Sequence, residues 1–264
     1  MKKLFVCLLS LAVCAVSTVS AAPAENVTLL GDSIATGYGL VGYSAGNPLL
    51  AEESFGSLLS RRFGGEYTNR AVDGSTTGDL LAALENGEYP ISGGTVIVSI
   101  GGNDLLQPML SALQSAVLTN PAAIQAMLSG EAEPDMAQLT ERYSDRIIEE
   151  IGELDLRQSI LNIEKIAQII SGTADCRLYM LTVYNPFEGI AGLEKLSDFA
   201  EQKLCELNGG IKSLDGVTVV DVNAAFRGRS TELTNILSAD VHPNAAGHKV
   251  IFELICAQAP QPVY

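Results

Sequence analysis

The sequence predicts a three-layer α/β/α domain, in which a parallel sheet of about five strands lies between two layers of helices. Apolar segments alternate with segments of helical periodicity along the chain. Each apolar segment is apolar or β-branched at consecutive positions, which is typical of strands buried on both faces. The chain contains no internal repeat and no low-complexity linker. We therefore expect one α/β domain.

Five segments carry the strand pattern, and helical patterns lie between them. The predicted strands are 27–30, 66–69, 95–100, 178–183 and 217–222. The predicted helices are 58–63, 147–154, 156–170, 196–207 and a last helix that starts after Asn244. We expect Gly172 to end the third helix, and Gly209 with Gly210 to end the fourth, because glycine commonly follows the last turn of a helix.

The first residues of the chain have the pattern of a secretory signal peptide. Two lysines precede an apolar run at 4–16, and small residues follow it. The run is too short to span a membrane comfortably. We expect cleavage after Ala21, or otherwise after Ala24, which would divide the chain into a signal peptide at 1–21 and a mature domain at 22–264. The mature protein is then expected outside the cytoplasm, without stable insertion into a membrane.

The charge of the chain restricts its partners. The sequence has 16 basic and 31 acidic residues, a formal net charge of −15. A surface of this charge repels nucleic acids and anionic membranes. We therefore expect no nucleic acid among its partners. The expected partner is a small-molecule or lipid-like substrate, and the protein is expected to be a monomer.

Three cysteines remain after the predicted cleavage, namely Cys176, Cys205 and Cys256. An odd number allows at most one intramolecular disulfide, and the spacing does not match a zinc site. Two of the cysteines lie late in predicted helices that run antiparallel to the strands, so we expect all three at the amino ends of the strands. The sequence leaves the pairing open.

Polar residues and glycines gather where the predicted strands end. The carboxyl ends of parallel strands share one edge of the sheet, and ligands bind in the loops beyond that edge. The residues that follow the five strands in turn are Ser33, Gly74, Asn103 and Asp104, Asn185, and Asp240 with His242. We expect these five loops to meet.

This set of residues suits acyl transfer by a serine. A serine hydroxyl needs an imidazole to take its proton, and His242 is the natural base because it lies in a loop at the same edge. The oxyanion that forms on the substrate needs hydrogen-bond donors. Glycine lets the backbone approach closely, so the N–H groups of Ser33 and Gly74 can point at one oxygen, and the side-chain amide of Asn103 offers a third donor.

Four short motifs resemble the SGNH superfamily of GDSL esterases and lipases. They are GDS at 31–33, the glycine of VDGSTT at 72–77, GGND at 101–104 and DVHPN at 240–244. The resemblance implies a flavodoxin-like sheet, Ser33 as nucleophile, His242 as base, and an oxyanion hole made by Ser33, Gly74 and Asn103. It implies neither a metal nor an organic cofactor.

The acidic partner of the histidine departs from the family's pattern. The superfamily usually places this residue three positions before the histidine, which is Ala239 here, whereas Asp240 lies two positions before. Some members use a main-chain carbonyl instead, so the Ala239 carbonyl is the alternative. We favour Asp240 because a carboxylate holds the imidazolium more strongly.

Other polar residues at this edge have simpler expected roles. Asp32 should anchor the loop that carries the nucleophile, and Asp104 and Asn185 should brace their loops. His248 is expected at the surface or at the start of the last helix rather than as a second base.

The substrate is less clearly indicated. Residues 105–146 form a predicted helical insertion with many apolar positions, and Pro108, Pro121 and Pro134 divide it into short helices. The insertion could form an apolar wall for an acyl chain or simply extend the core. Tryptophan is absent and aromatic residues make up 6% of the chain, which leaves few platforms for sugars. We therefore expect a secreted esterase or acylhydrolase of lipase or lysophospholipase type. The alternatives are a carbohydrate O-deacetylase and, less favoured, a non-catalytic binding protein.

Overall fold

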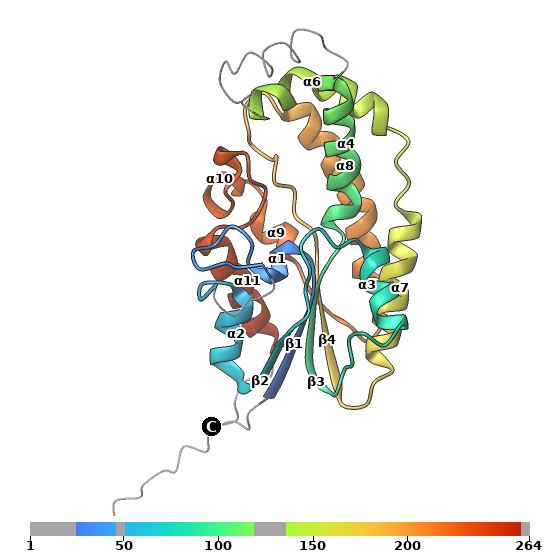
Figure 1. The fold of residues 1–264 in the computed structure, drawn as a ribbon, viewed down its shortest axis with the longest axis vertical. Coiled ribbons are helices and arrows are strands. Elements are labelled where there is room, and N and C mark those ends of the chain that lie inside the picture. Colours follow the sequence, from blue (N-terminus) through green and yellow to red (C-terminus); the bar gives the residue numbers. More distant parts are fainter. Residues whose placement is uncertain (1–24, 46–50, 119–135, 260–264) are drawn as a thin grey trace, which may run out of the picture.

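The computed structural model describes residues 25–45, 51–118 and 136–259, so the predicted signal peptide lies outside the described residues. Five parallel strands form one sheet in the order β2-β1-β3-β4-β5 (Figure 1). The strands are β1 Glu25–Gly31, β2 Gly64–Asn69, β3 Gly94–Ser99, β4 Cys176–Leu181 and β5 Thr218–Val220. The predicted fold class is confirmed.

Helices follow the strands and cover both faces of the sheet. Those before β4 are α1 Ser33–Thr36, α2 Phe55–Phe63, α3 Thr77–Glu85, α4 Gly102–Leu118, α6 Met136–Ile151 and α7 Arg157–Ser171. Those after β4 are α8 Glu194–Lys212, α9 Val222–Phe226, α10 Ser230–Leu233, the 3₁₀ helix η2 Ile236–Ser238 and α11 Ala245–Gln258. Ser54 and Asn244 cap α2 and α11 through side-chain oxygens that accept from Ser57 and Gly247 N–H.

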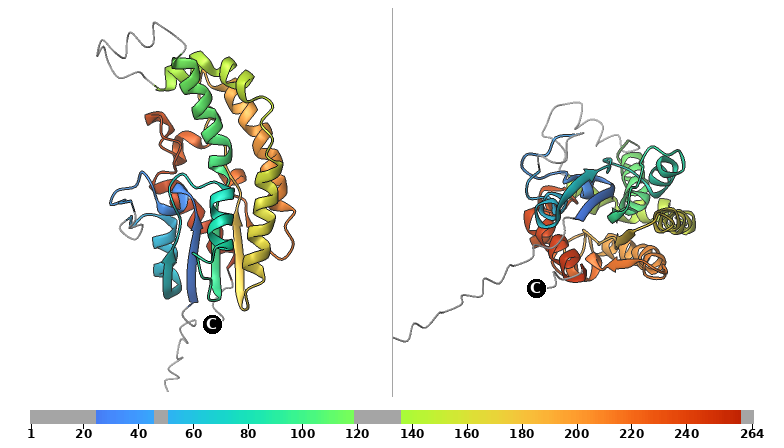
Figure 2. Two further views of the ribbon diagram at one scale, coloured as in Figure 1. Left: turned by 45° about the vertical axis from the view of Figure 1, so that its right-hand side comes forward. Right: turned by 90° about the horizontal axis from the view of Figure 1, so that it is seen from below.

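The two helical layers bury separate apolar clusters against the sheet. Residues of α3, α7 and the end of α8 pack on one face with Val96, Val98 and Met180. Residues of α2, α9 and α11 pack on the other face with Leu29, Ile97 and others. Figure 2 shows the sheet edge-on between these layers. The central strands are therefore buried on both sides, which is why their sequences do not alternate.

A third apolar cluster lies beyond the carboxyl ends of the strands. Helices α4, α6 and the first half of α8 extend past the sheet (Figure 1) and pack against one another. The expected division into short helices is wrong for 102–118, because α4 runs through Pro108 without a break. A proline inside a helix costs about 3 kcal/mol. Burial of several apolar side chains of α4, each worth about 1.5–3 kcal/mol, offsets that cost.

Helix α8 also differs from its predicted end. It continues through Gly209 and Gly210 to Lys212. A Cβ at Gly210 would lie 2.7 Å from the Ile160 side chain, so this glycine allows close packing of α8 on α7. The next residue, Ile211, is fully buried and extends the apolar face of the helix. Packing of α8 therefore outweighs the tendency of a glycine pair to end a helix.

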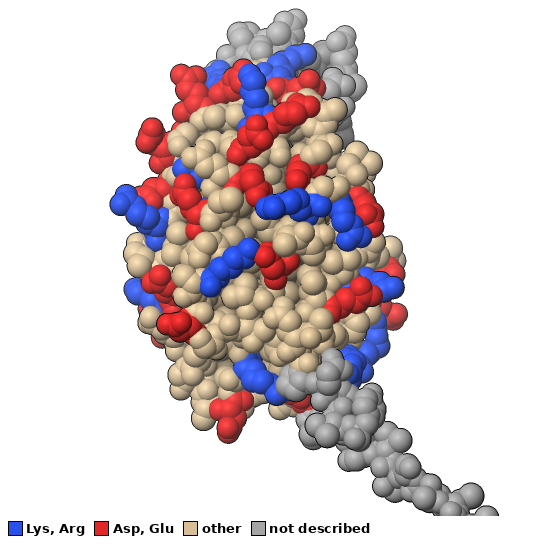
Figure 3. Space-filling view, turned by 180° about the vertical axis from the view of Figure 1, so that it is seen from behind, with Lys and Arg blue, Asp and Glu red and all other residues tan. Residues whose placement is uncertain are grey.

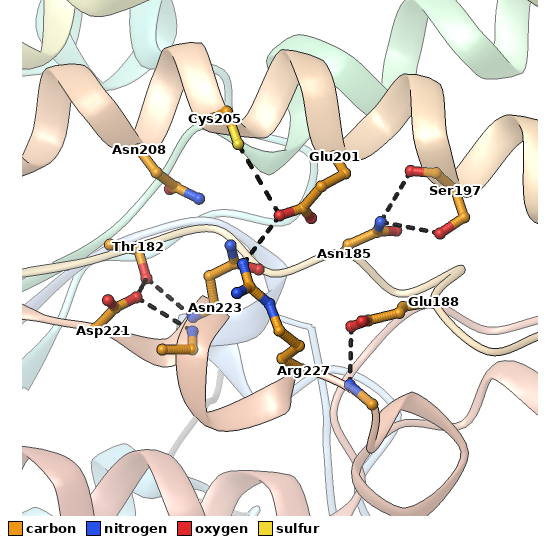
Figure 4. Close-up of polar contacts among 12 residues, drawn as sticks. Thr182, Asn185, Glu188, Ser197, Glu201, Cys205, Asn208, Asp221, Asn223 and Arg227 are labelled. Carbon is orange, nitrogen blue, oxygen red and sulfur yellow. Dashed lines mark hydrogen bonds and ion pairs between the residues drawn. The ribbon is translucent and has the colours of Figure 1, made fainter.

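The cysteines do not gather as expected. Cys176 opens β4 at the amino end of the sheet. Cys205 lies on α8, with its Sγ 4.0 Å from Glu201 Oε1. Asn208, one turn later on α8, binds the backbone of Val183, which follows the carboxyl end of β4. Cys205 therefore lies at the carboxyl end of the sheet, opposite Cys176. Figure 4 shows Cys205 on the same helix as Glu201 and Asn208, with its Sγ directed at the Glu201 carboxylate. All three cysteines of the described chain are free thiols.

The surface carries both signs of charge. Figure 3 shows acidic side chains spread over the rear face with lysines and arginines interspersed among them. Some of these charges are paired, as in Lys212 with Asp221 at 2.6 Å. In the part of the chain that the structure covers, no helix combines the length and the hydrophobicity needed to cross a bilayer.

His248 lies near the start of α11 but not at the surface. Its side chain is fully buried, its Nδ1 accepts a hydrogen bond from Phe55 N–H at 3.3 Å, and its ring stacks on the Phe55 ring. Its Nε2 has no hydrogen-bond partner among the described residues. Burial lowers the pKa of this imidazole from 6.5 to about 3. The expectation of a helix-start position is confirmed and that of a surface position is wrong.

His248 should therefore contribute to the pH dependence of stability. Below pH 6.5 the His248 imidazole binds a proton in the unfolded chain but stays neutral in the folded protein. Its contribution to the free energy of unfolding is therefore complete above that pH and is lost as the pH falls towards 3. In His248→Asn the amide oxygen still accepts from Phe55 N–H but the group does not titrate. Between about pH 6.5 and 5, the free energy of unfolding in urea should fall by about 2 kcal/mol more in the parent than in the variant.

Other titrating groups are common to both proteins and cancel in this comparison. Equal pH slopes for parent and variant would contradict a buried, neutral His248.

Candidate active site

The loop that joins β1 to α1 presents Ser33. Gly31 has φ +135°, and a Cβ there would lie 1.8 Å from the Ser99 carbonyl oxygen of β3. The chain then turns, Asp32 N–H donates to the same Ser99 oxygen at 3.0 Å, and Asp32 Oδ1 caps α1 by accepting from Ile34 N–H at 3.1 Å. Ser33 becomes the first residue of α1. The expected anchoring role of Asp32 agrees with these contacts.

His242 comes from the loop before α11, and its ring faces Ser33. The Nε2 of His242 lies 2.8 Å from Ser33 Oγ, although 209 positions separate the two residues. The loop is fixed on both sides of the histidine side chain. Asn235 N–H donates to the His242 carbonyl at 2.9 Å, and the buried Tyr184 hydroxyl donates to the Val241 carbonyl at 2.7 Å.

Asp240 lies against the other nitrogen of this ring. Its Oδ1 is 2.5 Å from His242 Nδ1 and also accepts from His242 N–H at 3.0 Å. Ala239 ends η2 with φ +57°, a left-handed conformation that alanine rarely adopts. This conformation reroutes the backbone so that a carboxylate two positions before the histidine reaches its ring. Within the described residues, the Ala239 carbonyl makes no hydrogen bond to His242.

The three donors expected for an oxyanion come from the first residue of α1, the turn at Gly74 and the first turn of α4. Gly74 has φ +77° in the turn where Ser75 N–H donates to the Val72 carbonyl. Gln107 of α4 holds this turn, because its Nε2 donates to the Gly74 carbonyl at 2.7 Å. In the described part of the chain, neither Ser33 N–H nor Gly74 N–H donates a hydrogen bond to another residue.

One of the two amide hydrogens of Asn103 already makes a hydrogen bond. Its Nδ2 donates to the Ser75 carbonyl at 2.9 Å, which leaves the second amide hydrogen for another acceptor. Asn103 lines one cavity with Ser33 and His242, whereas Gly74 does not line it. The structure thus brings Ser33, Asp240, His242 and Asn103 together, with the Gly74 turn bound to Asn103 through Ser75.

Asp104 and Asn185 brace the loops around the site. Asp104 accepts hydrogen bonds from Thr77 N–H at 2.9 Å, Thr77 Oγ1 at 2.6 Å and Ser159 Oγ at 2.8 Å, which ties the start of α4 to α3 and α7. Asn185 donates to Ser197 (Figure 4) and accepts from Phe187 N–H.

The Asp32 carboxyl is buried, and its pKa is raised. Its side chain is almost completely buried, and this burial raises the pKa of its carboxyl to about 7. The backbone N–H of Ile34 opposes the shift only in part. The raised pKa favours the neutral carboxyl beside Ser33, which is the form that places no negative charge next to a developing oxyanion.

Sequence reasoning missed an aromatic pair at the mouth of the site. The Tyr38 ring lies 4.5 Å from the His242 ring and 5.2 Å from the Tyr43 ring. The Tyr43 hydroxyl binds the Asp73 carboxylate, which also accepts from Thr36 Oγ1 at 2.6 Å. The only signal in the sequence is the position of Tyr38 between Gly37 and Gly39, directly after α1.

No group of three or more His, Cys, Asp or Glu side chains in the described ranges is arranged to hold a metal ion. The polar groups that converge on Ser33 are instead an imidazole, a carboxylate, a side-chain amide and backbone N–H groups.

A comparison with protein families identifies the relatives of this site. The model of the GDSL-like lipase/acylhydrolase family matches residues 29–250. The chain belongs to this family. Members of the GDSL-like family are serine hydrolases, so the protein is a serine hydrolase of ester bonds. The match includes all four motifs of the sequence resemblance, which is confirmed. No curated protein matches the chain.

Solved structures show the same fold at low sequence identity. An extracellular lipase from Streptomyces rimosus has a TM-score of 0.59 and 20% identity, covering 89% of this chain and 100% of that one. A phospholipase A1 from Streptomyces albidoflavus has a TM-score of 0.59 and 17% identity, covering 90% of this chain and 100% of that one. At these identities the likeness shows the GDSL fold and not the substrate.

Tyr184 should position the loop that carries His242. Tyr184→Phe removes the hydroxyl that holds the Val241 carbonyl, and a hydrogen bond of this kind contributes about 0.5–1.5 kcal/mol. We expect kcat for ester hydrolysis to fall up to roughly tenfold, with little change in KM, because the ring of His242 is less well oriented while the aromatic ring at position 184 still lines the cavity.

Tyr67→Phe is the matched control. It removes a partly buried hydroxyl that accepts from Asn69 Nδ2 at 3.2 Å on β2 and does not contact the His242 loop. Equal loss of kcat in both variants would mean that Tyr184 acts only through general stability.

Proposed function

We propose that this GDSL-like hydrolase is a secreted acylhydrolase that cleaves lipid-like carboxylic esters through an acyl-enzyme on Ser33. The observation that carries the proposal is the chain of contacts from Ser33 Oγ to His242 Nε2 at 2.8 Å and from His242 Nδ1 to Asp240 Oδ1 at 2.5 Å. This arrangement supplies a nucleophile, a base within hydrogen-bond distance, and a group that holds the base in one orientation.

The first half of the reaction forms the acyl-enzyme. Ser33 Oγ attacks the ester carbonyl carbon as His242 Nε2 takes the hydroxyl proton, and Asp240 stabilises the imidazolium. The N–H groups of Ser33 and Gly74 and the Asn103 amide donate to the oxyanion. When the tetrahedral intermediate collapses, the bond from carbon to the alcohol oxygen breaks, and His242 returns its proton to the leaving alcohol.

The second half releases the acid. A water molecule attacks the acyl carbonyl carbon while His242 takes one of its protons. Collapse breaks the bond to Ser33 Oγ, and the same proton returns to the serine. The products are a carboxylic acid and an alcohol, and no cofactor enters the balance.

The lining of the Ser33 cavity supports an apolar substrate. Apart from Asp32, Ser33, Asn103 and His242, the side chains around it are apolar or aromatic, and Leu105, Leu106 and Met109 of α4 form one wall. Leu105, Leu106 and Met109 belong to the predicted insertion, and we propose that this part of it forms the wall for an acyl chain. Secretion is proposed from the N-terminal pattern of two lysines and an apolar run.

A carbohydrate O-deacetylase is the second candidate. Tyr38 is 41% exposed above His242, and its contact with Tyr43 makes a small aromatic surface against which a sugar ring could stack. A panel of acetylated sugars and longer acyl esters separates the two candidates, because a deacetylase would prefer acetyl groups.

Ser33→Ala tests the proposed nucleophile. The change should lower kcat by several orders of magnitude, as loss of the serine does in other serine hydrolases, and should abolish labelling by a fluorophosphonate probe. The thermal unfolding midpoint should change little, because one hydroxyl is removed. The control is Ser57→Ala, which lies on α2 away from His242 and should keep both labelling and activity. Labelling of Ser33→Ala at the parent's rate would exclude Ser33 as nucleophile.

A further inference from the structure

Two apolar cavities meet beside the site. The first, here called the site cavity, holds about 60 Å³ and includes Ser33 and His242 in its lining. The second, the distal cavity, holds about 130 Å³, and all of its lining residues are apolar. Both exceed the roughly 15 Å³ that one water molecule needs on this measure. Four residues line both cavities, namely Leu106, Met109, Phe187 and Val241.

Helix α4 connects the oxyanion donor to the distal cavity. Asn103 lies in its first turn, and Leu106, Leu110 and Leu113 follow at helical spacing along the same wall. At 1.5 Å per residue, the distance along the helix from Asn103 to Leu113 is about 15 Å. A substrate whose carbonyl oxygen contacts Asn103 therefore has a continuous apolar wall of about that length beside it.

The side of the site on which water must enter determines how the ester is oriented, that is, where its acyl chain and its alcohol lie. His242 gives its proton to the leaving alcohol and then activates water, so its side of the site must be open to solvent. The His242 side chain is 16% exposed, and Tyr38 above it is 41% exposed. The apolar distal cavity is unsuited to water, and it suits the group that stays bound during both steps, which is the acyl chain.

We propose that the acyl chain of the substrate runs along α4 from the site cavity into the distal cavity, and that Leu106 and Leu113 determine the preferred chain length. This inference rests on the proposed acylhydrolase function. Leu106 lies where the cavities join, and Leu113 lines only the distal cavity. Leu110 is 51% exposed at the distal cavity, so a chain that fills the cavity next meets solvent and gains nothing further from added methylenes.

The experiment measures kcat/KM of each purified protein on p-nitrophenyl acetate, butyrate, octanoate and laurate. In the parent, the value should rise with chain length by up to roughly fourfold per buried methylene and then level off. Leu106→Phe narrows the junction and should lower the ratio of octanoate to acetate kcat/KM by roughly tenfold or more. Leu113→Ala enlarges the distal cavity and should move the preferred ester towards laurate.

Leu161→Phe is the matched control. Leu161 is 49% exposed on α7 and lines neither cavity, so this variant should keep the parent's ratio. Because each ratio is taken within one protein, differences in the amount of active enzyme cancel.

Failure of this inference is distinguishable from failure of the proposed function. If the parent hydrolyses none of the esters, the acylhydrolase proposal is wrong. If it hydrolyses them with no dependence on length, or if neither Leu106→Phe nor Leu113→Ala changes the length preference, the esterase remains and the acyl path along α4 is wrong. Should Leu106→Phe fail to fold, the shift in Leu113→Ala alone decides.

Discussion

The close approach of Gly31 to Ser99 is the constraint on which the site depends. A side chain at Gly31 would collide with the Ser99 carbonyl oxygen at 1.8 Å, and the backbone there has φ +135°. Only glycine adopts this conformation readily and allows this contact. The contact lets β1 stay beside β3 to its last residue and then turn into α1, which places Ser33 Oγ opposite His242. Ser33 then lines the same cavity as Asn103 and His242.

The loop that carries His242, the proposed base, is under some strain. Ala239 occupies the left-handed region, which costs a residue with a side chain roughly 1–2 kcal/mol. The hydrogen bonds from Asn235 N–H to the His242 carbonyl and from Tyr184 to the Val241 carbonyl offset this cost. Strained backbone is common at functional sites, where the surrounding structure holds it. Here it brings the Asp240 carboxylate, two positions before His242, into line with Nδ1.

The parts that could be predicted from sequence are those with a local signal. Segments rich in apolar and β-branched residues predicted β1, β3, β4 and β5, β2 was predicted from the weaker pattern at 66–69, and motifs after the strands predicted which loops meet. Packing decided the rest: α4 passes through Pro108, α8 passes through Gly210, and His248 is buried, because apolar contacts elsewhere outweigh the local preference.

Some residues around the site have no local signal at all. Gln107 and Tyr184 act through hydrogen bonds to the distant Gly74 and Val241 carbonyls, so nothing in their own sequence neighbourhood indicates the contact. The sequence also predicts the wrong end of the sheet for Cys205. The reason is similar, because the position of this residue relative to the sheet depends on how far α8 extends beyond the strands.

The most direct test of the account is kcat for Asp240→Asn. If the carboxylate holds the imidazole with Nε2 towards Ser33, the amide favours the wrong tautomer, and kcat should fall by roughly 10³- to 10⁴-fold, as for the equivalent change in a serine protease triad. The control Asp198→Asn removes an exposed carboxylate of α8 and should leave kcat near the parent value. A kcat for Asp240→Asn within about tenfold of the parent would contradict the account and leave Ser33 and His242 to act as a dyad.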